Sequence, residues 1–405
     1  RDPVRSAQRV GPHALLIGLF ECARGALLFT LLPNHLRFGV GHQMAVVGLA
    51  LSAYSFTELV AKIPSGWVID RGGRRLPLLV GLILSSLAVA LLGRVQETWA
   101  VLLAAALGGL GASPVWPSVV SGVAEAARDG ERGSAMGAVL TGWMVGTGVG
   151  VVGASFLLEL GTPVAFGFVL SCLALTFPFV PAATEDGAPA EGRRTPRPAQ
   201  GQEVSLLRLW PLVGGMFLQT AAVGMLLPVL SPYAREVLRL SPFWIGVLLV
   251  AGPGLTVLLL VPLGRLMDRL GRMEVLPLSL GVGAVVLFTL PSLRAPWTVA
   301  VAVAFLGLAY ATLLPAWNAL LMDLLPRHRR ATGLGLAMAL EGLGVAVGTG
   351  TGGVIWDAWG PAQPFHVAAV VLACVAVGYL TLLPRVVEGT NSQTSSLRPR
   401  RTPGL

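Results

Sequence analysis

The chain contains twelve long apolar stretches separated by short polar segments, and this pattern severely limits what it can fold into. A helix needs about 20 mostly apolar residues to cross the hydrocarbon core of a bilayer. Hydrophobic residues make up 54% of the 405 residues and charged residues only 12%, which excludes an ordinary soluble globular domain. We therefore expect an all-α membrane protein with transmembrane helices near residues 13–33, 43–65, 76–93, 98–124, 135–158, 164–182, 209–232, 242–263, 275–291, 297–322, 331–356 and 364–384.

One polar stretch, rich in Pro, Gly and charge, divides these helices six and six. Its composition is typical of a flexible linker. The predicted organisation is a short N-terminal segment (1–12), a six-helix bundle (13–183), a linker (184–208), a second six-helix bundle (209–384) and a tail (385–405) that we expect to be disordered.

The distribution of basic residues predicts the orientation in the membrane. Short cytoplasmic loops carry an excess of Lys and Arg. Of the 29 basic residues, Arg24 and Lys62 lie within helices, and only five fall on the side opposite the termini: Arg37, Arg94, Arg235, Arg239 and Arg294. We expect both termini in the cytoplasm and a location in the inner membrane of a bacterial cell. The net charge of +9 is spread over the loops and does not indicate a nucleic-acid-binding surface.

A loop motif occurs twice. The segment from Gly66 to Arg75 reads GWVIDRGGRR, and the segment from Gly264 to Met273 reads GRLMDRLGRM. Five residues of the first copy recur 198 positions later: Gly66, Asp70, Arg71, Gly73 and Arg74. The same offset relates Glu125 to Asp323 and Arg37 to Arg235. Such duplication is typical of transporters built from two bundles around a central site.

The first motif resembles the signature loop of the major facilitator superfamily. The resemblance covers residues 13–384 and implies two pseudo-symmetric six-helix bundles that move a small solute by alternating access. It also implies that Asp70 faces the start of the eleventh helix near Ala331 and that Arg74 bridges Asp70 and Glu125. A helix N-terminus favours a nearby carboxylate. The expected cytoplasmic gate consists of Gly66, Asp70, Arg71, Gly73, Arg74 and Glu125, with the mirror set Asp268, Arg272 and Asp323.

Two charged residues lie in the middle of the first helix, where ionisable groups are costly and mark functional sites. Glu21 and Arg24 are three residues apart, so they share a face and can form an ion pair. We expect Glu21 to bind the coupling proton, while Arg24 either holds Glu21 ionised or binds an anionic substrate. The alternative is a static pair that fixes the first helix.

Glu341 lies about ten residues into the eleventh helix, with no basic residue in that helix to neutralise it. A carboxyl group in such a setting favours its protonated form, as a proton carrier requires. A salt bridge to Arg24 and a neutral hydrogen bond between helices are equally open alternatives. Further expected cavity residues are Trp143, Gln219, Tyr310, Trp317 and Asn318.

Other polar residues suggest structural roles. Glu58 and Lys62 are one turn apart and predict a local ion pair, whereas Glu159 and Asp357 mark outer helix ends. The three cysteines and five histidines show no metal-ligand spacing, and no phosphate-binding loop precedes the single lysine, so we expect no metal, no cofactor and no enzymatic activity.

The sequence thus predicts a monomeric secondary transporter with a small-molecule substrate and no nucleic-acid partner. Proton-coupled export (efflux by antiport) of amphipathic or hydrophobic molecules is the first hypothesis. Transport of sugars, organic anions or lipids, with Arg24 binding the substrate, is the second, and a non-transporting sensor is the third.

Overall fold

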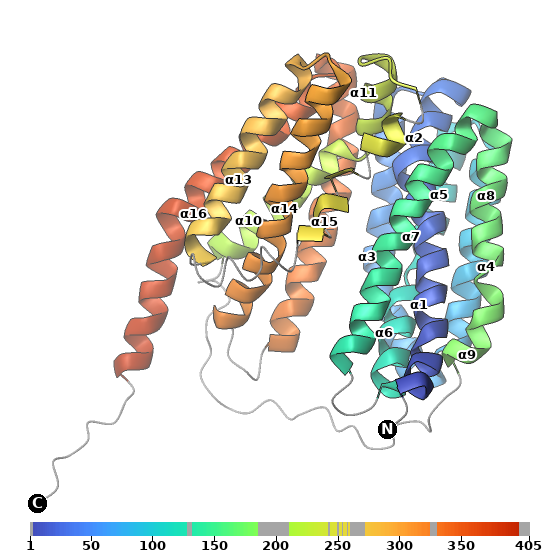
Figure 1. The fold of residues 1–405 in the computed structure, drawn as a ribbon, viewed down its shortest axis with the longest axis horizontal. Coiled ribbons are helices and arrows are strands. Elements are labelled where there is room, and N and C mark those ends of the chain that lie inside the picture. The colour runs from blue at the N-terminus through green and yellow to red at the C-terminus, as the bar shows by residue number, and fades with distance from the viewer. Residues whose placement is uncertain are drawn as a thin grey trace, which may run out of the picture.

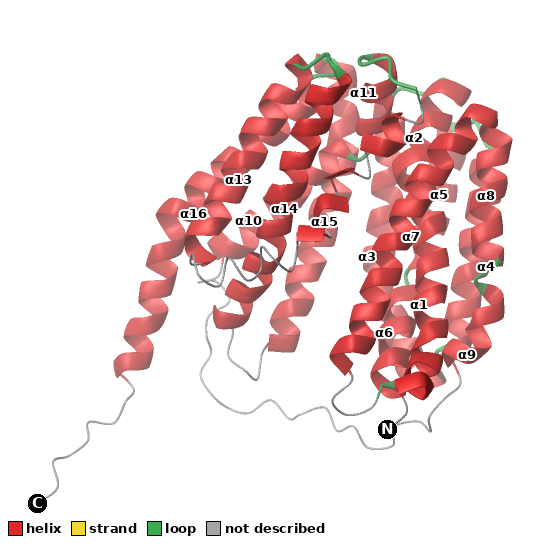
Figure 2. Ribbon diagram, in the orientation of Figure 1, coloured by secondary structure: helices red, strands yellow, loops and turns green. Residues whose placement is uncertain are grey.

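The protein forms two helical bundles that stand side by side (Figure 1). We analysed a computed structural model, which describes residues 3–127, 132–184, 210–241, 244–248, 251–252, 254–256, 258–259, 272–324 and 330–396. Helices dominate this part of the chain, and Figure 2 shows no strand in it. The all-α architecture with two six-helix bundles is confirmed.

The N-terminal bundle contains all helices before residue 185. Its elements are α1 (Pro3–Gly25), η1 (Ala26–Leu31), α2 (Leu32–Asn34), η2 (His35–Val40), α3 (Met44–Gly72), α4 (Arg75–Leu92), α5 (Thr98–Ala112), α6 (Val115–Ala126), α7 (Arg132–Leu160), α8 (Thr162–Ala174), η3 (Phe177–Phe179) and α9 (Val180–Thr184). Within this bundle α1 packs on α7, and α5 packs on both α3 and α4.

The C-terminal bundle repeats this arrangement. Its described elements are α10 (Trp210–Leu226), α11 (Leu230–Glu236), α13 (Arg272–Thr289), η5 (Leu290–Ser292), α14 (Pro296–Leu324), α15 (Arg330–Trp359) and α16 (Gln363–Ser396). Here α10 packs on α15 and α16, and α13 packs on α14 and α16.

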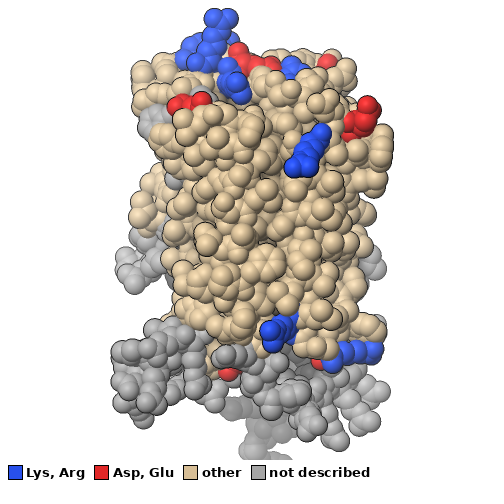
Figure 3. Space-filling model, turned by 90° about the vertical axis from the view of Figure 1, so that its right-hand side faces the viewer, with Lys and Arg blue, Asp and Glu red and all other residues tan. Residues whose placement is uncertain are grey.

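Eleven helical segments in the described part of the chain are long and apolar enough to cross a membrane. They coincide with eleven of the twelve predicted spans, and the structure describes the twelfth, residues 242–263, only in short pieces. In Figure 3, which shows the face of the N-terminal bundle, charged side chains gather near the two ends and leave a wide uncharged belt between them. This belt is the surface expected to face lipid.

The start of α1 and the end of α16 lie at one end of the molecule, called here the lower end as in Figure 1. The predicted linker 184–208 lies outside the described residues except for Thr184. Helix α16 continues to Ser396, past residue 384, where the sequence suggested that order would end. Once a helix has formed, each residue added to its end contributes one more backbone hydrogen bond. The preceding turns of α16 therefore favour a helical conformation for residues 385–396.

The first transmembrane helix changes from α-helical to π-helical geometry in its upper half. Residues 26–31 and 35–40 form π-helical turns on either side of Pro33. Pro33 has no N–H to donate to the helix, so the hydrogen-bond pattern is interrupted there. Such π-helical turns often occur at functional sites. Here they lie above the mid-helix charges, with Asn34 between the two turns and Arg37 within the second.

Candidate functional site

The two predicted charges on α1 belong to a network of four charges inside the N-terminal bundle. Arg24 Nε donates to Glu21 Oε2 at 3.0 Å, and Arg24 Nη1 donates to Glu58 Oε2 on α3 at 3.2 Å. Lys62 Nζ lies 2.9 Å from Glu58 Oε1. Acids and bases therefore alternate in the order Glu21, Arg24, Glu58, Lys62, and opposite charges stabilise each member at membrane depth.

The four side chains differ in their access to solvent. Glu21 and Glu58 expose 6% and 13% of their side chains, while Arg24 exposes 26% and Lys62 41%. The two cations therefore form the accessible part of the network, and the carboxylates lie behind them. A proton or an anion that enters this region meets Arg24 and Lys62 first.

The bond between Arg24 and Glu58 was not predicted from the sequence, which suggested only the local pair of Glu58 and Lys62. A signal was available, because the two residues lie at equal distances in the chain from Gly41, at the turn between the first two spans. Since helices rise by the same amount per residue, equal distances from a turn place two residues at the same depth. The local Glu58–Lys62 pair is present as predicted.

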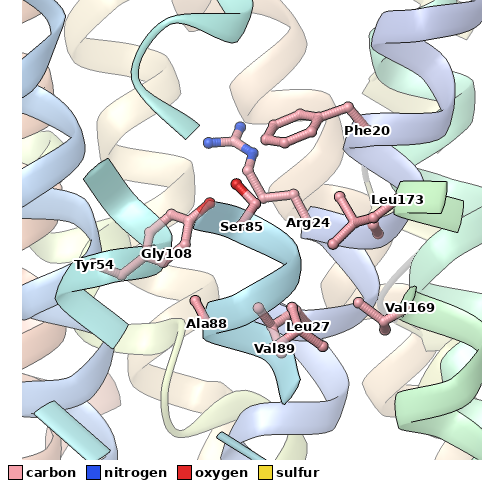
Figure 4. A pocket seen from close by; sticks show the side chains of 11 residues that line it. Phe20, Arg24, Leu27, Tyr54, Ser85, Ala88, Val89, Gly108, Val169 and Leu173 are labelled. Atoms are coloured by element: carbon pink, nitrogen blue, oxygen red, sulfur yellow. The ribbon is translucent and has the colours of Figure 1, made fainter. Parts of the chain in front are cut away.

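A small cavity of about 20 Å³ lies beside Arg24, as Figure 4 shows. Most of its lining is apolar and comes from α1, α4 and α8, with polar contributions from Arg24, Tyr54 and Ser85. The Ser85 hydroxyl is buried and has no hydrogen-bond partner among the described residues. The volume is sufficient for one water molecule, which needs two to four polar partners. Three such partners line this cavity.

Glu341 lies on α15 in the opposite bundle and is half-buried. The phenol of Tyr310 on α14 lies near enough to Glu341 to be affected by the charge of that carboxylate. Within the described residues Glu341 forms no ion pair and no hydrogen bond, and Arg24 is bonded to Glu21 and Glu58 instead. Neither the salt bridge to Arg24 nor a hydrogen bond between helices occurs in this conformation, so the hypothesis of a proton carrier is the alternative left open.

Two predicted cavity residues bond each other inside the C-terminal bundle. The Trp317 indole Nε1 donates to Gln219 Oε1 at 3.0 Å, and these residues expose only 2% and 6% of their surface. Trp317 also packs edge-on against Tyr379, whose hydroxyl donates to the carbonyl oxygen of Leu212. In this conformation Trp317 and Gln219 join α14 to α10.

The other three predicted cavity residues are Trp143, Tyr310 and Asn318. Trp143 is half-buried and packs edge-on against Trp116, with ring centroids 6.4 Å apart. Tyr310 keeps 46% of its surface exposed. The side chain of Asn318 lies outside the described residues.

The structure places the first motif copy at the lower end of the N-terminal bundle, where the sequence predicts one half of the gate. Arg74 is buried and lies 2.9 Å from Glu125, as predicted. Gly73 follows the last residue of α3 with φ = +80°, a conformation that favours glycine. Gly66 lies on α3, and Arg71 stacks on the Trp67 ring at 3.8 Å.

Asp70 is exposed and bonds no residue of α15 within the described part of the chain. The side chains of Asp268, Arg272 and Asp323 lie outside the described residues, so the mirror half of the gate is not observed. The bond that Asp70 was expected to make with the eleventh helix therefore belongs, if it forms, to another conformation.

The two bundles are joined instead at the upper end. Arg37 Nε donates to Glu236 Oε1 at 2.7 Å, and Asn34 Nδ2 donates to Ser231 Oγ at 2.6 Å. The carboxylate of Asp357 accepts from the backbone N–H groups of Met44 and Ala45. Every hydrogen bond and ion pair that joins the bundles within the described residues lies at this end, so the structure represents a conformation closed there.

Two cysteines that are far apart in the sequence also meet. The Sγ atoms of Cys22 on α1 and Cys172 on α8 lie 3.7 Å apart, and both thiols are free and buried. Sequence spacing gave no signal for this contact. The described residues contain no group of three or more His, Cys, Asp or Glu side chains able to hold a metal ion.

Comparison with known sequences and structures places this geometry in context. The sequence model of the Major Facilitator Superfamily matches residues 14–213 and again residues 212–403. A proton-coupled antiporter flippase, LtaA, from Staphylococcus saprophyticus is 27% identical over 317 residues, which cover 75% of this chain and 76% of that protein. The LtaA protein of Staphylococcus aureus is also 27% identical, over 320 residues.

Solved structures show the same fold at lower sequence identity. A bacterial homologue of the human lysosomal transporter Spinster superposes with a TM-score of 0.75 at 15% identity, covering 96% of this chain and 99% of that one. The nucleoside transporter NupG superposes with a TM-score of 0.73 at 13% identity, covering 93% and 99%. These similarities establish the arrangement of helices and leave the chemistry to the residues of this chain.

Proposed function

The chain belongs to the major facilitator superfamily of transporters, and from that premise we propose that it is a proton-coupled antiporter that exports amphipathic or hydrophobic molecules. Glu21 carries the proton, and Arg24 couples its protonation to movement of the substrate. Loss or gain of a charge in this network changes the balance of ion pairs that holds α1 against α3. No metal, no cofactor and no enzymatic step is needed.

The observation that carries the proposal is the sharing of Arg24 between Glu21 and Glu58. An arginine presents several N–H donors in a fixed plane, so it can bond two carboxylates at once. Protonation of Glu21 removes one of the two anionic partners of Arg24. The guanidinium is then held by Glu58 alone, and its partly exposed face becomes free to bind another anion.

The substrate class follows from the contrast between the two bundles. The N-terminal bundle presents the Arg24 and Lys62 cations, whereas the described part of the C-terminal bundle offers Tyr310 and Glu341 in a largely apolar setting. A molecule with a polar or anionic head and an apolar body matches both surfaces. Two relatives of this chain are named proton-coupled antiporter flippases, which supports the proposal of proton-coupled antiport.

The orientation rests on the basic residues. The described part of the lower end carries Arg71, Arg74 and Arg75, and the excess of arginine on this side of the chain favours the cytoplasm. Both termini then lie in the cytoplasm, the protein resides in the bacterial inner membrane, and the conformation closed at the upper end is open toward the cytoplasm. Nothing in the transport cycle requires more than one copy of the chain.

A second candidate keeps the fold but changes the role of Arg24. Its 26% exposed side chain favours direct binding of a sugar acid, an organic anion or a lipid headgroup, with Glu21 serving only to orient it. In that case, transport proceeds without stoichiometric proton movement.

Reconstituted liposomes distinguish the two candidates. A pH-sensitive dye inside the vesicles reports proton flux while amphipathic drugs, lipids with polar headgroups, sugars and organic anions are added in turn. The proposal expects an amphipathic compound to trigger proton flux that a sugar does not. Substrate movement without any proton flux would favour the second candidate.

A further inference from the structure

Helices α3 and α15, one from each bundle, pack against each other from the upper end to their middle. An added Cβ at Gly48 would lie 3.1 Å from the Gly353 nitrogen, and one at Gly342 would lie 3.0 Å from Leu59 Cδ1. Between these two contacts α3 advances from residue 48 to 59 and α15 goes back from residue 353 to 342, which is 11 residues in each helix. The helices are therefore antiparallel with a constant register, and this register predicts which residues lie opposite each other further along.

Below Leu59 and Gly342 the two helices part. Seven residues further along the same register, Gly66 of α3 is the counterpart of Gly335 of α15. An added Cβ at either of these glycines would meet no atom within 4 Å among the described residues, in contrast to the close contacts above. Closure of the lower end, which alternating access requires, brings these two helical segments toward each other.

Lys62 lies on α3 at the point where the helices part. It follows Leu59 by three residues, and the register places it opposite Ala339, two residues from Glu341. Two residues correspond to about 3 Å along the helix axis, which is within the reach of the flexible lysine side chain. The ammonium group lies 2.9 Å from Glu58 Oε1, yet 41% of the side chain is exposed. One carboxylate of its own helix therefore holds this cation and leaves it accessible to a second partner.

Glu341 lies on α15 at the same point, directly before Gly342. It is half-buried and forms no ion pair with any described residue. Each residue turns a right-handed helix by about 100°. Three residues forward from Leu59 on α3 and one residue back from Gly342 on the antiparallel α15 therefore turn toward the same side, so Lys62 and Glu341 flank one side of the helix pair. An unpaired carboxylate at membrane depth is costly, so a cation that reaches Glu341 stabilises the conformation in which the two meet.

We infer that Lys62 exchanges its partner during the transport cycle, bonding Glu58 while the lower end is open and Glu341 of the other bundle once the lower end closes. Lys62 is then a positioning residue that joins the N-terminal charge network to the C-terminal bundle in the second conformation only. The exchange rests on alternating access alone, not on the proposed substrate or on proton coupling. From the sequence, Lys62 was expected only in a local pair with Glu58, and Arg24 was the expected cation for Glu341.

Spin-label distances in the full-length protein test the exchange. Nitroxides at Leu76→Cys and Glu274→Cys, two exposed positions, one in each bundle, report the opening of the lower end, and the native cysteines are replaced by alanine. Glu341→Gln, Lys62→Met and their double variant form a double-mutant cycle, which isolates the interaction between the two side chains. Lys62→Arg is the conservative variant that keeps the charge. Glu97→Gln, an exposed carboxyl that precedes α5 at the upper end, is the control.

We expect Glu341→Gln to lower the ratio of closed to open lower ends by about 2- to 5-fold, as appropriate for a partly exposed ion pair, and so to lengthen the distances. In the Lys62→Met background the same substitution should have no effect, whereas in the Lys62→Arg background it should act as in the wild type. Glu58→Gln removes the present partner of Lys62 and should shift the distances in the opposite direction. The Glu97→Gln control should leave them unchanged.

Two results would overturn the exchange. One is an equal effect of Glu341→Gln with and without Lys62, because the carboxylate would then act through another group. The other is a wild-type distance distribution that Glu341→Gln leaves unchanged. Both results concern the opening of the lower end alone, so they leave the proton flux of the proposed function unaffected.

Discussion

Arg24 on α1 and Glu58 on α3 bond each other at 3.2 Å in the middle of the N-terminal bundle, although 34 residues separate them in the sequence. The same guanidinium bonds Glu21 on its own helix. Since one cation neutralises parts of two buried carboxylates, any change in the charge of either acid is felt by the other. This is the physical basis of the coupling between proton and substrate that we propose for this site.

Arg24→Lys tests whether the geometry of the guanidinium matters beyond its charge. An ammonium is a compact charge on a flexible stem and lacks the planar set of donors that spans two carboxylates. We expect substrate-driven proton flux to fall by about 10-fold or more, with folded protein still obtained. Arg94→Lys, at an exposed position of the upper end, serves as the control and should retain normal flux. Equal activity of both variants would show that charge alone suffices.

Asp70→Asn tests the half of the cytoplasmic gate that this conformation leaves unbonded. Asp70 is exposed here, so its charge contributes little to the conformation closed at the upper end. Its expected partner, the start of α15, is reached only when the lower end closes. We expect the variant to favour the present conformation, so spin labels attached at Leu76→Cys and Glu274→Cys, two exposed positions, one in each bundle, should report longer distances at the lower end. A shift toward shorter distances would contradict this role.

Ser85→Ala tests the cavity beside Arg24. The buried hydroxyl has no protein partner, so removal is neutral or stabilising if the cavity is dry. If a water molecule bridges Ser85 to Arg24 and Tyr54, we expect a loss of about 1 kcal/mol of stability. Thermal unfolding in detergent measures the difference. Ser86→Ala is the matched control, because that hydroxyl bonds only Leu82 O of its own helix.

Glycine substitutions on α7 test the packing of the N-terminal bundle. A methyl group at Gly150 would overlap the carbonyl oxygen of Cys22 on α1, whereas one at Gly148 meets no atom within 4 Å. We expect Gly150→Ala to lower stability by about 1 to 3 kcal/mol and Gly148→Ala to leave it nearly unchanged. Equal unfolding temperatures for the two variants would show that α1 and α7 accommodate the added methyl group without loss of stability.

The sequence predicted the helices and the division into two bundles because membrane spans have a simple physical requirement of length and apolarity. The resemblance of the first motif to the signature loop of the family also implied the Arg74–Glu125 pair, which is present at 2.9 Å. It could not show which gate is closed, because Asp70 and Asp357 have the same chemistry and only the conformation decides which of them meets a helix N-terminus. Nor could apolar periodicity show that Gln219 and Trp317 bond each other, since that depends on how α10 and α14 rotate.

Proton flux into liposomes by the wild-type protein and by Glu21→Gln, measured with an imposed pH gradient and an added amphipathic substrate, tests the central claim most directly. Glutamine keeps the shape of the side chain and a hydrogen-bond acceptor for Arg24 but cannot carry a proton. The account predicts substrate-driven proton flux in the wild type and none in Glu21→Gln, with binding of the substrate retained. Normal coupling in the variant would contradict the account and make Glu21 a structural partner of Arg24.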